Sequence, residues 1–299
     1  MLTAINTQEM MENEMHFVIC LLGCFIVLPA FMGIVPQSHV QSDLPDSFTI
    51  RIPGTTIPFT MILCPATPLE NLEGSTESTE SLYVLSTEVT WDLYDIFIFE
   101  LDEPDGSSAA DAVTRPSKPY IPPDRGFGHE GYPAIGMTRS AAESFCEWLS
   151  LKTGLAIRLP TQREWAFIAV GNSDDPYCCG IDADSLDQAS WFVDNAEHTS
   201  HPVGQKQPNR FGLFDIHGNA AEWVITDTRK PIAMGGSFRD AAEECESTST
   251  QKQLRSWNVS DPQIPKSQWW LADCSWVGFR FIVNADSINE TTLKEITDD

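Results

Sequence analysis

The stretch Gly212-Leu-Phe-Asp-Ile-His-Gly-Asn-Ala-Ala-Glu-Trp223 decides the fold of this chain, together with Gly235-Gly-Ser-Phe-Arg-Asp240 and Val277-Gly-Phe-Arg280. The first stretch is typical of a turn that supplies backbone carbonyls and carboxylates at fixed offsets. The Gly-Gly-Ser segment follows shortly after it. Candidate site residues are therefore concentrated in these three segments.

Two carboxylates of the first stretch, Asp215 and Glu222, stand seven residues apart around the turn at Gly218. Ca²⁺ takes several oxygen ligands from carboxylates and backbone carbonyls, and a tight turn can present both kinds together. The stretch therefore favours a calcium site. The alternative is that Asp215 caps the turn while Glu222 pairs with a buried arginine such as Arg280.

The composition fits an acidic globular protein. The chain has 299 residues, enough for one large domain or two small ones, and nine Trp among 42% hydrophobic residues supply ample core material. The formal net charge is −25. A surface this acidic repels phosphate backbones, so nucleic-acid binding is not expected, whereas solubility and cation binding are favoured.

An almost unbroken apolar run covers residues 17–35, after an acidic start and before a polar stretch. Its nineteen residues, at about 1.5 Å each, just span the hydrocarbon core of a bilayer. Residues 1–36 are therefore predicted to be a cleaved leader or a signal anchor, so the chain is exported to the cell envelope or secreted. Leu21-Leu-Gly-Cys24 looks like a lipidation motif, but the apolar run continues well past it. Residues 37–47 are predicted to be a linker.

Periodicity and capping signals predict a mixture of strands and helices. Alternating apolar and polar residues predict a strand at 48–53, and residues 57–63 and 83–86 are two further predicted strands. Thr90 is expected to cap a helix over residues 91–100, and Thr138 to begin a helix that ends at Gly154.

Later in the chain, Thr161-Gln-Arg-Glu164 is a capping box that opens a helix reaching Val170. Residues 70–81, rich in Glu, Ser and Thr, are predicted to be a solvated loop. One mixed α+β domain over residues 48–283, followed by a polar tail at 284–299, is the simplest interpretation.

Five short blocks in a fixed order resemble the domain of formylglycine-generating enzymes, also called sulfatase-modifying factors. They lie at 86–91, 131–150, 157–165, 201–223, and 235–237 with 278–280. The resemblance implies that family's single compact α+β domain, which is poor in regular secondary structure and related to C-type lectin-like folds. It also implies a calcium site in which Asp215 and Glu222 bind by their side chains and Gly218 and Ala220 by their carbonyls.

The family oxidises a substrate cysteine with O₂, using Cu(I) held by two cysteines five residues apart after Gly-Gly-Ser. At these two positions the chain has Asp240 and Cys245. A carboxylate is a poor ligand for a soft ion that prefers thiolates, so copper is not expected. Ser237 matches the family's active-site serine, and Ala221 replaces the tryptophan beside the oxygen pocket.

Cys245 and Ser237 are therefore the candidate catalytic residues. Each also has a structural alternative. Cys245 can be a buried or disulfide-bonded cysteine, with Cys274 as a candidate partner, and the Ser237 hydroxyl can satisfy backbone groups after the Gly-Gly turn.

Two further features carry no assigned chemistry. Cys178 and Cys179 are adjacent, and can form a vicinal disulfide, act as a ligand pair, pair elsewhere or stay free. His217 lies in the calcium turn and is a candidate base that faces the same cleft as Ser237.

These observations lead to one expected function and two alternatives. We expect an exported, calcium-stabilised domain of the sulfatase-modifying-factor family without copper oxidase chemistry, serving as a binding or accessory module or as an enzyme of unknown reaction. Its partner would be an exported protein or peptide, or a glycan. The alternatives are an oxidase that converts a sulfatase cysteine to formylglycine, and a lectin-like surface ligand-binding protein.

Overall fold

A computed structural model describes residues 45–66, 68–70, 76–78, 80–102, 115–116, 122–171, 173–228, 230–288, 291 and 293–294. These residues belong to one compact unit, Asp43–Asp299. The predicted leader and most of the predicted linker lie outside the described residues. Within the described part of the chain, no helix combines the length and apolar character needed to cross a membrane.

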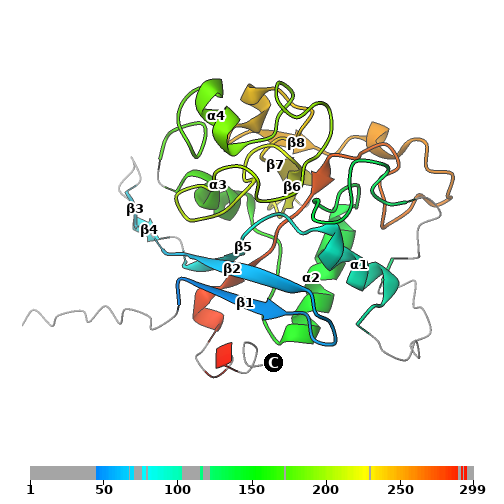
Figure 1. Cartoon of the computed structure of the whole chain (residues 1–299), viewed down its shortest axis with the longest axis horizontal. Helices are drawn as coiled ribbons and strands as arrows, with labels where there is room; N and C mark the ends of the chain where they lie inside the picture. Colours follow the sequence, from blue (N-terminus) through cyan, green and yellow to red (C-terminus); the bar gives the residue numbers. More distant parts are fainter. Residues whose placement is uncertain are drawn as a thin grey trace, which may run out of the picture. The chain divides into compact units, whose positions relative to one another are not determined.

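A four-stranded antiparallel sheet joins the two ends of the domain (Figure 1). Its strands, in the order β1-β2-β5-β10, are β1 (Ser47–Arg51), β2 (Pro58–Cys64), β5 (Leu82–Leu85) and β10 (Ile282–Asn284). β1 alternates exposed and buried side chains, as its sequence predicts. The three predicted strands are thus confirmed, and β10 pairs with β5 although about two hundred residues separate them.

The predicted solvated loop at 70–81 is wrong in part. β3 (Pro68–Glu70) and β4 (Thr76–Ser78) pair as a short antiparallel hairpin. Their polar composition carries no hydrophobic period, but the backbone groups of a hairpin can pair without apolar side chains.

Local capping signals set two of the helices. α2 (Arg139–Thr153) begins after Thr138, whose side chain accepts a hydrogen bond from Ala141 N, and ends at Gly154 in the left-handed conformation. α3 (Gln162–Val170) begins with the predicted capping box of Thr161 and Glu164.

The other two helices depart from the sequence expectation. α1 (Trp91–Phe99) forms where predicted, but Thr90 makes no side-chain capping bond. Instead α1 is held by burial, since six of its nine residues are buried. The short helix α4 (Ala183–Ala189) was not predicted, because its seven residues contain only one buried large apolar side chain, Leu186.

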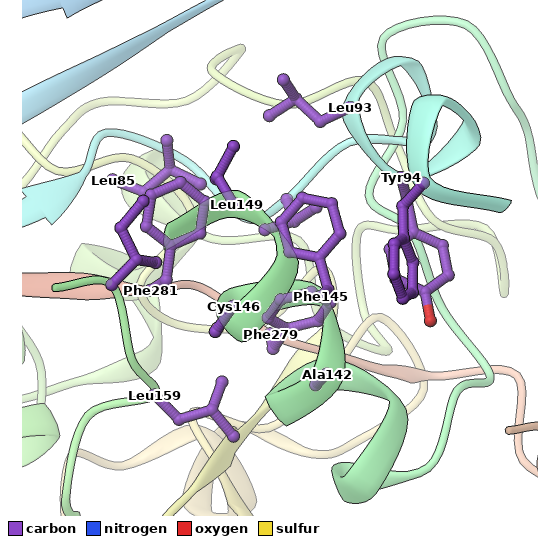
Figure 2. Close-up of a cluster of buried hydrophobic side chains, with 14 of the residues drawn as sticks. Leu85, Leu93, Tyr94, Ala142, Phe145, Cys146, Leu149, Leu159, Phe279 and Phe281 are labelled. Carbon is purple, nitrogen blue, oxygen red and sulfur yellow. The ribbon is translucent and has the colours of Figure 1, made fainter. Parts of the chain in front are cut away.

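The main hydrophobic core packs α2 against the chain that leads into β10. Figure 2 shows Phe145 and Leu149 of α2 gathered with Phe279 and Phe281. Phe145 and Phe279 meet edge to face with ring centroids 5.4 Å apart, a favourable geometry for aromatic pairs. This packing holds the segment between β9 and β10, which carries Arg280, against α2.

A second four-stranded sheet carries the sequence segments that decide the fold. Its order is β8 (Thr250–Lys252), β7 (Ile232–Met234), β6 (Ala221–Val224) and β9 (Val277–Gly278), with β6 and β9 parallel. Short 3₁₀ helices lie at Ala242–Cys245, Arg255–Asn258 and Ala285–Ser287. The architecture is α+β and poor in regular secondary structure, as predicted.

The chain after residue 284 also contributes to the core. Ile288 and Leu293 are buried in the main cluster. With Ala285, the segment predicted as a polar tail therefore adds three apolar side chains to the core.

Candidate functional site

The turn before β6 depends on unusual backbone conformations. Asp215, Gly218 and Asn219 all have positive φ, at 51°, 71° and 50°. A Cβ atom on Gly218 would lie 2.2 Å from the carbonyl oxygen of Trp191, so this position requires glycine. The turn brings Asp215 and Glu222 into the domain interior, where both are about 1% exposed.

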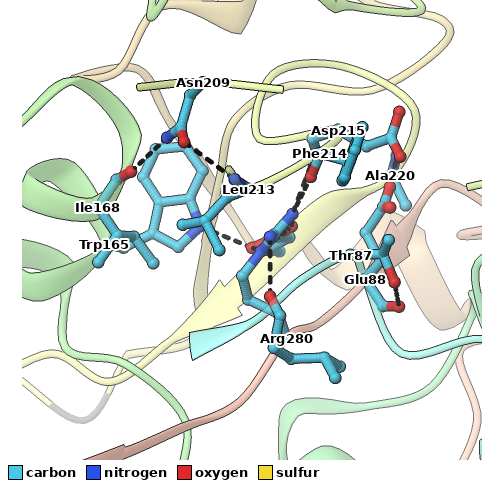
Figure 3. A network of polar contacts seen from close by, with 12 residues as sticks. Thr87, Glu88, Trp165, Ile168, Asn209, Leu213, Phe214, Asp215, Ala220 and Arg280 are labelled. Atoms are coloured by element: carbon cyan, nitrogen blue, oxygen red, sulfur yellow. Dashed lines mark hydrogen bonds and ion pairs between the residues drawn. The ribbon is translucent and has the colours of Figure 1, made fainter. Parts of the chain in front are cut away.

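Glu222 is paired with Arg280, which lies within the polar network drawn in Figure 3. Arg280 Nε donates to both carboxylate oxygens, at 2.7 and 2.8 Å, and Trp165 Nε1 donates to Oε2 at 2.7 Å. Both residues of the ion pair are buried. Of the two sequence interpretations of Glu222, the buried arginine pair is therefore the one that the structure contains.

The same guanidinium also holds two other segments, β5 and the turn before β6. Its terminal nitrogens donate to the carbonyls of Leu85 at 3.3 Å, Phe214 at 2.9 Å and Asp215 at 3.3 Å. Arg280 thus ties β5 and the turn to β6. Burial by itself would lower the pKa of Arg280, but the nearby carboxylates, chiefly Glu222, outweigh this and raise it.

Asp215 and Glu88 are two further buried acids beside the ion pair. Asp215 Oδ2 accepts a hydrogen bond from Gly204 N at 2.6 Å, and Glu88 Oε1 accepts one from Ala220 N at 3.3 Å. Among the described residues, the second oxygen of each side chain is buried and has no hydrogen-bond partner. Burial raises the pKa of Asp215 to about 6 and, together with the Asp215 charge, raises that of Glu88 well above its usual range.

Sequence reasoning missed Glu88. It lies in the block Ser86-Thr-Glu-Val-Thr-Trp91, where only its position between short apolar stretches hints at burial. Its partner Ala220 is 132 residues away along the chain. No local signal predicts that contact.

Of the two predicted side-chain ligands for calcium, Asp215 is suited to hold a cation and Glu222 is not. Asp215 Oδ1 is an unpaired buried oxygen and suits a hard cation, whereas both oxygens of Glu222 are engaged by Arg280 and Trp165. Glu88 Oε2 is a second unpaired oxygen that the sequence did not indicate. Within the described residues, no three His, Cys, Asp or Glu side chains are arranged to hold a metal.

The candidate catalytic residues form a closed, satisfied cluster. Ser237 Oγ donates to Asp240 Oδ2 at 2.6 Å, and Gln251 Nε2 donates to the same oxygen at 2.6 Å. Ser237 is fully buried, and Asp240 is 9% exposed. The serine hydroxyl is therefore satisfied by a neighbouring carboxylate and not by backbone groups.

Cys245 lies close behind the Gly-Gly turn. A Cβ atom on Gly236 would meet its sulfur at 2.5 Å, which shows how tightly the thiol is packed. Burial, and then the charges of Asp240 and Glu244, raise the pKa of Cys245. The thiolate needed for a nucleophile or a copper ligand is thus disfavoured.

The residues present therefore do not fit Cu(I). One of the two ligand positions holds the oxygen donor Asp240, which is already hydrogen-bonded, and the other holds a buried thiol. Cys245 and its candidate partner Cys274 are both free thiols in the structure. No step through copper follows from this donor set.

His217 connects Cys245 to the loop that carries Cys178. Its Nδ1–H donates to the Cys245 carbonyl at 2.7 Å, and its Nε2 accepts from Cys178 N at 2.9 Å. The imidazole is fully buried, and this burial lowers its pKa to about 4. His217 therefore acts as a neutral structural link, and among the described residues its two ring nitrogens bond to Cys245 and Cys178 and not to Ser237.

The structure contains three clefts that are not lined by the candidate catalytic residues or by Asp240. Two of them, with volumes of 390 and 500 Å³, flank α3 and share Arg163, Ala166 and Thr248. A third, of 710 Å³, follows the loop at 263–269. Ser237, Asp240 and Cys245 line none of these three.

Comparison with known proteins supports the family resemblance. The model of the sulfatase-modifying factor enzyme 1-like domain matches residues 49–285. Three solved structures are similar in fold: Treponema denticola variable protein 1 (TM-score 0.57, 19% identity, covering 81% of this chain and 100% of that one), PvdO from Pseudomonas aeruginosa (0.54, 20%, 78% and 99%) and CarF (0.51, 18%, 81% and 100%).

Curated relatives match over shorter stretches. The serine/threonine-protein kinase pkn1 of Chlamydia pneumoniae is 31% identical over 97 residues, which cover 32% of this chain and 14% of the kinase. The chaperone protein LppX of Paenibacillus barcinonensis is 26% identical over 83 residues, 22% of this chain and 30% of that protein. The chain thus spans well under half the length of these relatives.

We predict that Glu222→Gln lowers the free energy of unfolding by about 3–5 kcal/mol, because it leaves the buried Arg280 charge without its counter-ion. Glu143→Gln is the matched acid-to-amide control, since it removes only a surface pair with Arg139 at 3.5 Å and should cost about 0.5 kcal/mol or less. Urea denaturation at pH 7 measures both. Equal losses in the two variants would contradict the central role of the ion pair.

We also predict a pH-dependent contribution from His217. Its pKa is about 4 in the folded protein, against an ordinary value of 6.5, so its stabilising contribution is present above pH 6.5 and is lost as the pH falls through 4. The stability difference between wild type and His217→Gln should shrink by about 3 kcal/mol between pH 7 and pH 4. Chemical denaturation at each pH measures it, with His198→Gln as an exposed control. A difference that does not change with pH would refute this role.

Proposed function

Because the chain belongs to the family of sulfatase-modifying factor enzyme 1-like domains, we propose that it is an exported accessory or binding module of that family without copper oxidase activity. The observation that carries the proposal is the hydrogen bonding of the Asp240 carboxylate. This residue occupies one copper-ligand position, and its Oδ2 accepts hydrogen bonds from Ser237 and Gln251. Asp240 Oδ2 is thus held by two neutral hydrogen-bond donors.

Two further features support a module without oxidase chemistry. Cys245 is completely buried, and burial raises its pKa, so a thiolate is costly to form there. Ala221, at the position of the family's oxygen-pocket tryptophan, is itself buried in β6. One copper ligand and the oxygen-pocket tryptophan are thus replaced, by Asp240 and Ala221, and the remaining cysteine is packed in the interior.

Export is the part of the proposal that rests on the sequence. The apolar run at 17–35 has the length and position of a leader or signal anchor. The partner of such a module would be another exported protein or peptide, and a glycan is the alternative that a C-type lectin-like fold allows. A binding array that contains both ligand classes separates them.

Calcium is the second part of the proposal. Asp215 would hold the cation through its unpaired Oδ1, and Glu88 would supply a second oxygen. Main-chain carbonyls of the turn at Gly218 and Ala220 would complete the site, as the family resemblance implies. The bound ion would relieve the repulsion between the two buried carboxylates and so stabilise the fold.

Copper binding tests the loss of oxidase activity. We expect wild type and Cys245→Ser to give the same weak response in a Cu(I) competition titration, and wild type to leave a cysteine-containing sulfatase peptide unchanged under O₂. Asp240→Cys is the matched positive variant, since it restores the second sulfur at the position that the family uses. Stoichiometric Cu(I) binding by wild type that Cys245→Ser abolishes, or aldehyde formed on the peptide, would overturn the proposal.

Calcium binding is tested by thermal unfolding in a chelator and after addition of Ca²⁺. At a hundredfold excess over its dissociation constant, the ion should raise Tm by roughly 5–10 °C. Asp215→Asn should abolish this rise and Glu88→Gln should reduce it, whereas the exposed control Asp194→Asn should keep it. If neither the addition of Ca²⁺ nor the Asp215 substitution changed Tm, the site would be ruled out.

A further inference from the structure

Cys178 and Cys179 form the tip of a tight turn. Tyr177 and Gly180, on either side of the pair, are joined by an antiparallel bridge. Gly180 has φ 147°, and a Cβ atom there would lie 2.6 Å from Ser185 Oγ in α4. The turn is therefore closed at its base, and the two cysteines are held at its end.

The inner side of this turn is anchored to the domain. Cys178 N donates to His217 Nε2 at 2.9 Å, and Ser247 N donates to the Pro176 carbonyl at 2.8 Å. Tyr177 is buried with Leu186 and Phe192 in a small hydrophobic cluster. These contacts fix the backbone of the pair without using either thiol.

The two thiols differ in exposure and in acidity. Cys178 is half-buried and Cys179 is exposed. A hydrogen bond between the side chains lowers the pKa of Cys179 and raises that of Cys178, so the Cys178 S–H donates to the Cys179 sulfur. Cys179 is thus the better nucleophile, and its neighbour is already in contact with it.

The other described cysteines lack both properties. Cys64, Cys146, Cys245 and Cys274 are each 2% exposed or less. Burial raises the pKa of each of them, to about 12 for Cys64 and Cys274. Among the cysteines that the structure describes, thiol reactivity is therefore concentrated at the 178–179 turn.

We propose that Cys178 and Cys179 form a thiol–disulfide exchange site that reacts with low-molecular-weight disulfides such as oxidised glutathione. Such a site requires one exposed thiol, a second thiol in contact with it, and a backbone that is held in place. Neither the calcium site nor the loss of copper chemistry enters this proposal.

The exchange balances in two steps. The Cys179 thiolate attacks one sulfur of the small disulfide, whose S–S bond breaks, and one thiolate leaves. Cys178 then loses its proton and attacks the Cys179 sulfur of the mixed disulfide, which expels the second thiol and closes a disulfide between the adjacent residues. The protein loses two electrons and two protons, and the small disulfide is reduced to two thiols.

Intact-mass spectrometry after treatment with oxidised glutathione tests the proposal. The full chain is used with Cys20→Ser and Cys24→Ser, because those cysteines lie outside the described residues. This protein should lose two hydrogen atoms and retain no glutathione. Adding Cys178→Ser should trap one glutathione on Cys179, and adding Cys179→Ser should slow the reaction by about tenfold or more.

Cys64→Ser in the same background is the matched control for a buried thiol and should react like the parent. Peptide mapping then places the lost hydrogens or the adduct on residues 178 and 179. A parent protein that keeps its glutathione adduct would refute ring closure. Equal reaction rates with and without Cys179, or an adduct mapped to another cysteine, would refute the site itself.

Discussion

The structure depends on keeping the Arg280 guanidinium charged inside the domain. A buried charge is tolerated only when it is paired and its hydrogen-bonding groups are satisfied. Glu222 supplies the counter-charge, and the carbonyls of Leu85, Phe214 and Asp215 accept hydrogen bonds from the terminal nitrogens. Since these partners come from β5, the turn and β6, one side chain fixes the relative positions of segments that are far apart in the sequence.

This constraint explains why the domain needs so little regular secondary structure. The turn at Asp215 is held from inside by Arg280 and by the required glycine at 218. Beyond it, Asp240, Ser237 and Gln251 form a second polar cluster that closes the place where the family's oxidases use sulfur. The paired polar clusters around Arg280 and Asp240 connect segments that longer helices and strands would otherwise hold together.

The sequence was most informative where structure is local. Thr138, Gly154 and the capping box at Thr161 predicted the ends of α2 and α3, because each cap bonds to a backbone group within a few residues. It also named Arg280 as an alternative partner for Glu222. It did not indicate Glu88 or the contact between His217 and Cys178, since these depend on chain crossings that no periodicity records. The hairpin of β3 and β4 is local, but its polar sequence carries no hydrophobic alternation that would predict strands.

The interior charge balance around Arg280 has a chemical consequence. One guanidinium faces three buried carboxylates, Glu88, Asp215 and Glu222, so the pair with Glu222 neutralises it and two acids remain. Burial raises the pKa of both, which means that the site retains a proton where an exposed acid would be ionised. A divalent cation would replace that proton and leave both acids ionised. The proposed cation would therefore compete with protons for the same two oxygens, so acidification would release a bound ion.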